Sequence, residues 1–154
     1  MRRAPILLAA LIASCLGAFG QEAYSPLSTA MAQRRLEAYV DTWSSNKEIN
    51  GANVAHYYAD RVIYYGKPMS RRQVLDDKLR YISVWPERHY RIVPGTVAAA
   101  CDRQQSMCRV SGVMAWQRRS RAGGSSIGSA RLSLILSRAS GGRIVREAAS
   151  LHSQ

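Results

Sequence analysis

Acidic residues are scarce in this 154-residue chain: ten aspartates and glutamates stand against 22 lysines and arginines, which gives a formal net charge of +12. Cysteine and histidine are also rare, with three residues of each. So few cysteines exclude a small scaffold that depends on many disulfides. The hydrophobic fraction of 47% excludes a disordered chain and predicts a packed core. The length suits a single domain.

Motifs of metal and nucleophile chemistry are missing as well. His56, His89 and His152 are far apart in the sequence and lack the spacing of metal ligands. No Gly-x-Ser-x-Gly nucleophile elbow occurs. The glycine pair Gly123-Gly124 lacks the lysine of a phosphate-binding loop. We therefore expect no metal and no cofactor, and we assign no catalytic residue.

The first 20 residues have the pattern of a signal peptide. Arg2 and Arg3 precede a short apolar run over residues 6–16. Ala18-Phe19-Gly20 then places small residues where a signal peptidase reads them, which predicts cleavage before Gln21. The pattern predicts a mature protein in the periplasm or secreted from the cell.

A lipid anchor is the alternative. Ile12-Ala13-Ser14-Cys15 fits a bacterial lipobox, in which Cys15 becomes the lipidated N-terminus. The apolar run continues past Cys15, which favours ordinary cleavage. No later segment is apolar enough to span a bilayer, so we expect no transmembrane segment in the mature protein. Both alternatives predict an exported domain.

The other two cysteines are expected to form a disulfide. Cys101 and Cys108 are seven positions apart, and runs typical of strands lie on both sides of them. Exported proteins form disulfides, and a pair that flanks a hairpin loop can meet at bonding distance. The spacing fits neither a metal-binding pair nor a Cys-x-x-Cys redox motif.

Helical patterns occupy the N-terminal half. Apolar residues at i, i+3, i+4 and i+7 predict a helix over about residues 30–45, with Leu36 and Trp43 on its apolar stripe. A shorter helix is predicted over about 50–59, followed by a strand over 61–65 that Gly66-Lys67-Pro68 ends. Ser70 and Gln73 form a capping-box pattern before a third helix, which ends at Trp85. Its expected apolar stripe is Val74, Leu75, Leu79 and Ile82.

Strand patterns follow the helices. Turns of hairpin length separate five of them, so we expect an antiparallel sheet. Helices followed by a run of strands indicate an α+β fold, with three helices packed on one face of the antiparallel sheet. The domain boundaries are predicted as a signal peptide (1–20), a short polar leader (21–29) and one folded domain (30–151). The five strands are expected at residues 89–93, 96–101, 107–118, 127–138 and 143–151.

This order of elements resembles the nuclear transport factor two-like superfamily, also called the cystatin-like cone. The segment at 56–66, HYYADRVIYYG, looks like the superfamily's second helix, its "Tyr-Ala-Asp" end and its first strand. Residues 62–67, 70–71 and 85–90 look like exported bacterial members. The resemblance covers about residues 30–151. It implies three helices packed on a strongly curved antiparallel sheet, with a pocket between the helices and the sheet. It implies no single function, because the superfamily includes enzymes, ligand binders and interaction domains.

The acid–base residues of the superfamily's enzymes have no clear counterpart. Ketosteroid isomerases use an aspartate in the first strand, where this chain has residues 64–67 without a carboxylate. Dehydratases and cyclases use His–Asp pairs. His56 and Asp60 have the spacing of one helical face, but Asp60 ends the helix, so we expect structural roles for both. Glu147 follows Arg143 and Arg146 in the last predicted strand, and we expect an ion pair there in preference to a pocket acid.

Aromatic residues form the one constellation that suits a binding site. Tyrosine has an apolar body and a polar tip, which suits the wall of a ligand pocket, although core packing is the alternative for each of these residues. An arginine among them could meet an anionic group of a ligand. The candidate ligand-binding residues are Tyr58, Tyr64, Tyr65, Trp85, Arg88, Tyr90 and Trp116.

The positive charge fits several partners. The arginines are spread along the chain, and residues 118–121 make the one dense patch. Export argues against nucleic acid, which leaves a solvated loop, an acidic partner or an anionic envelope surface. The sequence favours an exported, non-catalytic domain that binds an envelope protein or a small apolar ligand. The alternatives are a small isomerase, dehydratase or cyclase, and a structural module that forms homodimers.

Overall fold

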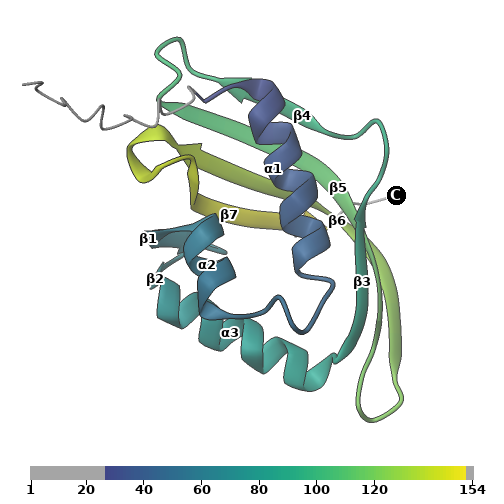
Figure 1. Ribbon diagram of the computed structural model, residues 1–154. Helices are drawn as coiled ribbons and strands as arrows, with labels where there is room; N and C mark the ends of the chain where they lie inside the picture. Colours follow the sequence, from purple (N-terminus) through teal and green to yellow (C-terminus); the bar gives the residue numbers. More distant parts are fainter. Residues whose placement is uncertain (1–26, 152–154) are drawn as a thin grey trace, which may run out of the picture.

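The structure is a computed structural model that describes residues 27–151 (Figure 1). The predicted signal peptide, the Cys15 alternative and the cleavage site before Gln21 lie outside the described residues. None of the helices in the described part is long and apolar enough to cross a membrane.

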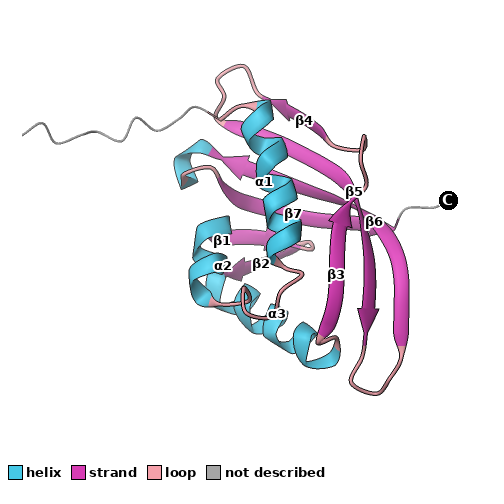
Figure 2. Cartoon of the chain, turned by 45° about the vertical axis from the view of Figure 1, so that its right-hand side comes forward, coloured by secondary structure: helices cyan, strands magenta, loops and turns pink. Residues whose placement is uncertain are grey.

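Three α-helices and seven strands make up residues 27–151, in the α+β order that the sequence predicts (Figure 2). The helices are α1 (Thr29–Thr42), α2 (Gly51–Tyr57) and α3 (Arg71–Val84), with one short 3-10 helix, η1 (Arg138–Ser140). The strands are β1 (Tyr58–Tyr64), β2 (Lys67–Ser70), β3 (Glu87–Ile92), β4 (Ala98–Cys101), β5 (Met107–Arg119), β6 (Ser125–Ser137) and β7 (Arg143–Leu151).

One strongly curved sheet carries the fold. Its order is β2-β1-β7-β6-β5-β3, with β4 beside the first half of β5. All pairs are antiparallel except β1 and β7, which are parallel. The prediction of a wholly antiparallel sheet is therefore wrong at this pair. Turn signals report only on strands that follow each other, and no turn joins the first strand to the last.

A tight hairpin follows β1. Residues 67–70 form strand β2, although the sequence pattern predicts a break there. Tyr65 and Gly66 both have positive φ, at 47° and 82°, as a two-residue hairpin turn between twisted strands requires. The proline in β2 is tolerated because this strand lies at the edge of the sheet.

Helix α1 fills the concave side of the sheet. The Ser28 side chain caps it by accepting from the Met31 N–H. The predicted apolar stripe is confirmed: Leu36 and Trp43 are buried together with Tyr39 and Val40. These residues pack toward β3, β4 and β5, over which α1 runs in Figure 1.

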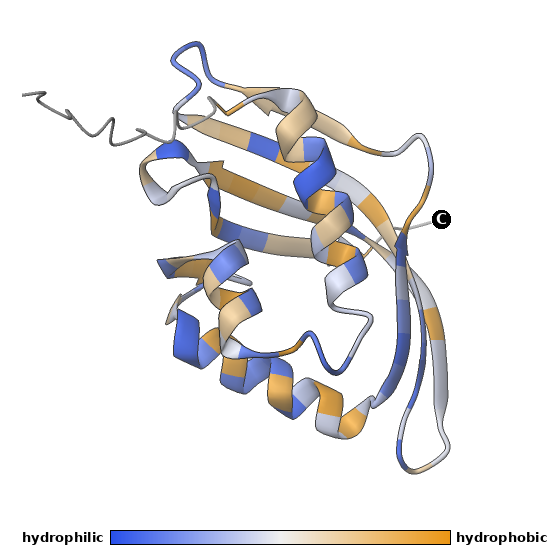
Figure 3. Cartoon of the chain, viewed as in Figure 1, coloured by the Kyte–Doolittle hydropathy of each residue, from blue (hydrophilic) through white to orange (hydrophobic). Residues whose placement is uncertain are grey.

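Helix α3 begins with the predicted capping box, in which Ser70 and Gln73 satisfy each other's backbone N–H groups. Its buried residues are Val74 and Lys78, whereas Leu79 is 42% exposed. The predicted stripe was therefore wrong at Leu79, since the lysine one position earlier faces the interior. Figure 3 shows hydrophilic and hydrophobic residues alternating along this helix.

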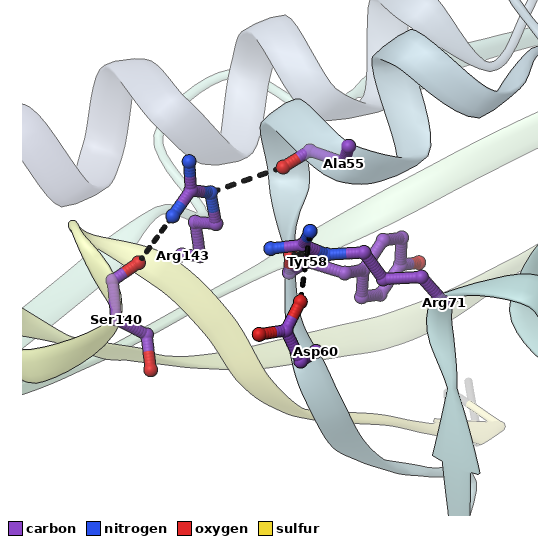
Figure 4. Close-up of polar contacts among 6 residues, drawn as sticks. All are labelled: Ala55, Tyr58, Asp60, Arg71, Ser140 and Arg143. Carbon is purple, nitrogen blue, oxygen red and sulfur yellow. Dashed lines mark hydrogen bonds and ion pairs between the residues drawn. The ribbon is translucent and has the colours of Figure 1, made fainter.

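Two arginines hold the junction between α2 and β1 (Figure 4). The Arg71 Nε donates to the Tyr58 carbonyl, and its Nη1 pairs with Asp60 at 2.8 Å. The Arg143 Nε donates to the Ala55 carbonyl near the end of α2. His56 is exposed nearby. The ion-pair partner of Asp60 is thus Arg71 rather than His56.

The predicted disulfide is confirmed. Cys101 and Cys108 lie directly opposite each other across β4 and β5, with their Cα atoms 4.0 Å apart. The bond closes a short hairpin ring at the end of the sheet, and Cys108 is fully buried.

Reducing this disulfide is expected to lower the free energy of unfolding by about 2.5 kcal/mol, since the ring no longer limits the unfolded chain. Denaturant unfolding with and without dithiothreitol measures the change. A variant with both Cys101→Ala and Cys108→Ala is the control and should not respond to the reductant. Equal stability of the oxidised and reduced wild-type chain would contradict the expectation.

Candidate functional site

A cavity of about 320 Å³ lies between α1, α3 and the concave side of the sheet. That volume is at the lower end of the range of about 300–1,000 Å³ that small-molecule sites occupy. Four charged residues reach its wall: Asp77, Lys78, Arg118 and Glu147. Aromatic side chains make up much of the rest, namely Tyr39, Trp43, Tyr64, Tyr65, Tyr81, Tyr90 and Trp116.

Glu147 lies on the wall of this cavity and is 2% exposed. Its Oε2 accepts from the hydroxyls of Tyr39 at 2.7 Å and Tyr58 at 2.5 Å, and its Oε1 accepts from Tyr65 at 2.9 Å. The expected ion pair with a neighbouring arginine was wrong. Three tyrosine hydroxyls hold the carboxylate instead.

A bulge in β7 explains this placement. Ile135 and Leu136 of β6 are neighbours, yet they pair with Arg146 and Ile144, so Val145 is an extra residue in β7. In a regular strand, residues three apart face opposite sides. The extra residue lets both Ile144 and Glu147 face the interior, where they are buried.

Short contacts between oxygen atoms connect Glu147 with Tyr39, Tyr58 and Tyr65. We call these four residues the Glu147 cluster. The hydroxyls of Tyr39 and Tyr58 are also 2.6 Å from each other. The Tyr39 hydroxyl, the Tyr58 hydroxyl and Glu147 Oε2 thus make three close contacts with one another. The two phenols have only two protons, so at any moment one of the three contacts has no proton. A proton can therefore change partners within the cluster without a large movement of the side chains.

Burial keeps these phenols protonated. It raises the pKa of Tyr39 and Tyr58 well above the usual tyrosine range, and the negative charge of Glu147 adds to the effect. The pKa of Tyr64 is raised for the same two reasons, in the same order. At neutral pH the site therefore presents neutral hydroxyl donors around one carboxylate.

Lys78 is the buried cation of the site. Its Nζ donates to the Tyr39 hydroxyl at 3.3 Å and lies 4.3 Å from the ring centre of Trp43. The rings of Tyr58 and Tyr64 are each 5.6 Å away. Burial lowers the pKa of Lys78; the charges of Glu147 and Asp77 oppose this effect, and Arg88 adds to it. No ion pair joins Lys78 to a carboxylate in residues 27–151.

Arg118 forms part of the wall on the side of β5. Its guanidinium lies 4.4 Å from the Trp85 ring and 5.5 Å from the Trp116 ring, and its Nη1 donates to the Tyr81 hydroxyl. Arg118 was expected within a basic patch at a hairpin tip. It is instead half-buried among aromatic rings, while Arg119 is exposed.

The predicted ligand-binding residues divide into two groups. Tyr64, Tyr65, Tyr90 and Trp116 line the cavity, and Tyr58 lies behind its wall on Glu147. Trp85 and Arg88 are outside this lining.

Arg88 instead holds the turn after α1. Its Nε donates to the Trp43 carbonyl at 3.0 Å, and its Nη1 donates to Asn46 and to the Trp85 carbonyl. Burial lowers its pKa. Its contacts are thus with the chain itself, and it borders a shallow surface groove rather than the cavity.

Sequence reasoning missed Tyr39 and Lys78 as site residues and assigned Glu147 a different role. Val74, Lys78 and Ile82 have the i, i+4, i+8 spacing of one helical face, which could have placed the lysine beside the core. Within residues 27–151, no group of three or more potential metal ligands occurs.

Trp116 is packed over a glycine of the neighbouring strand. It lies opposite Gly128 in the register of β5 and β6. A Cβ at Gly128 would be 2.4 Å from Cζ2 of the indole, which is too close for both to keep their places.

Gly128→Ala is therefore expected to displace Trp116 and to lower the free energy of unfolding by about 1–3 kcal/mol. Tryptophan emission should shift with it, since Trp116 lines the cavity. Denaturant unfolding and emission spectra measure the two effects. Ser129→Ala, one residue further along β6, is the control and should stay within about 0.5 kcal/mol of wild type. An unchanged emission spectrum for Gly128→Ala would count against this packing.

The fold and the cavity define an α+β cone with a buried carboxylate in its pocket. No protein-family model matches the chain, and no curated protein matches it in sequence. The fold itself is the nuclear transport factor two-like cone, as solved structures of that superfamily show.

One similar structure is a nuclear transport factor 2 (NTF2-like) superfamily protein from Salmonella enterica, at 10% identity and a TM-score of 0.66 over 82% of this chain and 92% of that one. A proposed scytalone dehydratase from Novosphingobium aromaticivorans has 8% identity and a TM-score of 0.64 over 80% and 85% of the two chains. A proposed polyketide cyclase from Pseudomonas putida has 11% identity and a TM-score of 0.53 over 79% and 91%. At these identities the likeness shows the fold alone, and the predicted α+β cone is confirmed.

Proposed function

We propose that this chain binds a small ring compound, mainly apolar with one polar group, in the cavity of the cone. The observation that carries the proposal is the composition of the wall, in which seven aromatic side chains accompany one buried carboxylate. Aromatic walls favour flat apolar molecules, and a few convergent polar groups then fix their orientation.

The Glu147 cluster supplies that orientation. A ligand with a hydroxyl or N–H group can donate to the carboxylate, and a ligand with a carbonyl group can accept from Lys78 or from a tyrosine hydroxyl. Because Glu147 and Lys78 are buried, a ligand bond to either of them is stronger than it would be in water. A purely apolar molecule would displace water from Glu147 and Lys78 without offering them a hydrogen bond, so we expect such a molecule to bind more weakly.

Binding can be tested through the tryptophans. Trp43 and Trp116 line the cavity, so a bound ring should quench their emission. We expect naphthol to do so with saturation. Ala149→Phe should weaken binding at least about tenfold, because residue 149 lines the cavity. Ala148→Phe is the matched control: this neighbouring residue of β7 is also exposed and does not line the cavity. Equal binding by both variants would refute the assignment of this cavity.

Proton-transfer catalysis is the second candidate, and the shared protons of the Glu147 cluster favour it. A carboxylate linked to hydroxyls of raised pKa can accept a proton and pass another on. The similar structures include a proposed dehydratase and a proposed cyclase, which supports the candidate by analogy of fold.

This candidate predicts that the protein exchanges hydrogen next to the carbonyl of a cyclic ketone in D2O. Glu147→Gln should abolish the exchange while keeping the side-chain shape. Deuterium uptake by mass spectrometry is the measurement. If the wild-type chain and the variant give the same background exchange, the catalytic candidate fails and the binding role remains.

Export is a further part of the proposal. The N-terminal pattern of the sequence and the disulfide between Cys101 and Cys108 both support a periplasmic or secreted protein. We expect the exported chain to begin at Gln21, as determined by N-terminal sequencing. A lipidated Cys15 would establish the anchored alternative, and an uncleaved chain that stays in the cytoplasm would refute export. An envelope protein or a second copy of the chain is proposed as a partner.

A further inference from the structure

Lys78 has surroundings that are unusual for a lysine. Its side chain is 9% exposed, lines the cavity, and has the Tyr39 hydroxyl as its hydrogen-bond partner. Four aromatic rings lie within 5.6 Å of its Nζ. A lysine that only neutralised a buried carboxylate would form an ion pair with it, and Lys78 forms none within residues 27–151.

Several charged and titratable groups face Lys78 from the elements around it. Glu147 on β7 and Asp77 on α3 favour its protonated form, whereas Arg88 on β3 and burial disfavour it. The tyrosines on α1 and β1 are protonated at neutral pH and add no charge. The balance lowers the pKa of Lys78, so a larger fraction of it is neutral amine than of an exposed lysine.

We propose that Lys78 is an amine nucleophile that forms an imine with an aldehyde or a ketone bound in the cavity. The inference rests on the proposed binding of ring compounds and names their reactive group. Its structural basis is a cavity that contains, in one place, an amine without an ion-pair partner, a hydroxyl that accepts from that amine and donates to Glu147, and aromatic walls for the body of the ligand.

The reaction is balanced without any oxidant or reductant. The lone pair of the neutral amine attacks the carbonyl carbon, and the electrons of the C=O bond move to its oxygen. A proton then passes from nitrogen to that oxygen, which gives a carbinolamine. The C–O bond breaks as the nitrogen lone pair forms C=N, and the oxygen leaves as water after it takes one more proton. Loss of the remaining N–H proton yields the neutral imine.

Tyr39 is placed to supply the proton for the departing water. Its hydroxyl is 3.3 Å from Lys78 Nζ and 2.7 Å from Glu147 Oε2. The phenol is protonated at neutral pH, since even the ordinary tyrosine pKa is about 10. The Glu147 cluster can return a proton to Tyr39 after the transfer. Tyr39 is thus a candidate proton donor, and Glu147 a positioning residue behind it.

The composition of the chain provides an internal comparison. It has three lysines, and the other two, Lys47 and Lys67, are exposed. An amine with the reference lysine pKa of about 10.4 is almost fully protonated at neutral pH. Each unit by which the pKa of Lys78 is lower raises its neutral fraction about tenfold, provided the pH lies below both pKa values.

Reductive trapping tests the proposal. The folded mature chain is incubated at about pH 7 with benzaldehyde and sodium cyanoborohydride, which delivers hydride to the iminium carbon and fixes the ligand as a benzyl amine. Peptide mapping then measures labelling at each lysine and at the N-terminal amine. We expect Lys78 to react at least about tenfold faster than Lys47 and Lys67, a difference that shrinks toward pH 10. Equal rates at the three lysines in the folded protein would overturn the proposal.

Variants separate chemistry from access. Lys78→Met should remove the fast labelling and leave the other two lysines unchanged. Tyr39→Phe should slow labelling of Lys78 while the ring and the fold remain, and Ala149→Phe should slow it by closing the cavity. If Tyr39→Phe and Ala149→Phe both leave the rate unchanged, the amine is reacting outside the cavity and the proposal fails.

The same samples distinguish this proposal from the proposed function. Quenching by naphthol without fast labelling of Lys78 would refute the imine and retain the binding site. Fast labelling that saturates with benzaldehyde, together with quenching, would support both. The absence of quenching and of fast labelling would refute both.

Discussion

Replacing Glu147 by alanine is expected to lower the free energy of unfolding by about 3–5 kcal/mol. The change leaves the hydroxyls of Tyr39, Tyr58 and Tyr65 without their acceptor and opens space in a buried region. It also removes the carboxylate that favours the charged form of Lys78. Denaturant unfolding monitored by circular dichroism measures the loss, and naphthol binding should disappear with it.

Two further variants calibrate this result. Glu87→Ala removes a carboxylate whose side chain is 73% exposed and 3.9 Å from Arg119, so it should cost less than about 1 kcal/mol. Glu147→Gln keeps an acceptor oxygen and the side-chain shape, and should fall between the two. If Glu147→Ala were no more harmful than Glu87→Ala, the buried cluster would not exist as described.

Alkaline pH is expected to unfold the protein steeply. Tyr39, Tyr58 and Tyr64 are buried, and their pKa values in the folded chain lie above the unfolded value of about 10. Their contribution to stability is therefore fully present below about pH 10 and is lost as the pH rises further, because only the unfolded chain then releases these protons. Above about pH 10, each tyrosine lowers the free energy of unfolding by about 1.4 kcal/mol per pH unit. The three together therefore lower it by about 4 kcal/mol per pH unit.

Lys78 has the opposite effect on stability. The pKa of Lys78 is lowered in the folded chain, so the folded chain loses this proton at a lower pH than the unfolded chain does. The free energy of unfolding therefore rises with pH, up to the unfolded lysine pKa of about 10.4. Urea unfolding at several pH values between about 7 and 11 should give a maximum near pH 10. Lys78→Met should remove the rise, and Tyr58→Phe should reduce the later fall. Tyrosinate absorbance that develops in full while the chain stays folded would contradict the prediction.

Local signals in the sequence predicted most of the fold. The capping box at Ser70 and Gln73 and the apolar stripe on α1 depend only on residues within one helix, and both are present in the structure. The turns between β5, β6 and β7 also involve near neighbours in sequence, and the disulfide spans one hairpin. The parallel pairing of β1 with β7 has no local signal, and the predicted antiparallel sheet failed there.

The candidate site was harder to predict because it also depends on contacts between residues far apart in the sequence. Strand alternation fails at the bulge around Val145, and a sequence pattern does not reveal where an extra residue will sit. Lys78 was missed because a lysine on a helix usually faces water. Here aromatic rings of other elements and the Tyr39 hydroxyl surround its amine and compensate for its burial.

Four of the seven aromatic residues of the cavity wall were among the candidates, because tyrosine and tryptophan suit a ligand pocket by their chemistry alone, whereas Tyr39, Trp43 and Tyr81 were not. Tyr64 and Trp116 line the cavity, yet a ligand for them stays a prediction.

The parallel pairing of β1 with β7 has a consequence for how the protein matures. Glu147 is separated by 89 residues from Tyr58 and by 108 residues from Tyr39. Contacts of such long range form late in folding, because a large loop must close before they repay its entropy. A chain without β7 would lack Glu147, the acceptor for the hydroxyls of Tyr39 and Tyr58. We therefore expect the pairing of β7 with β1 to complete the wall of the cavity, to which β7 contributes Glu147 and Ala149.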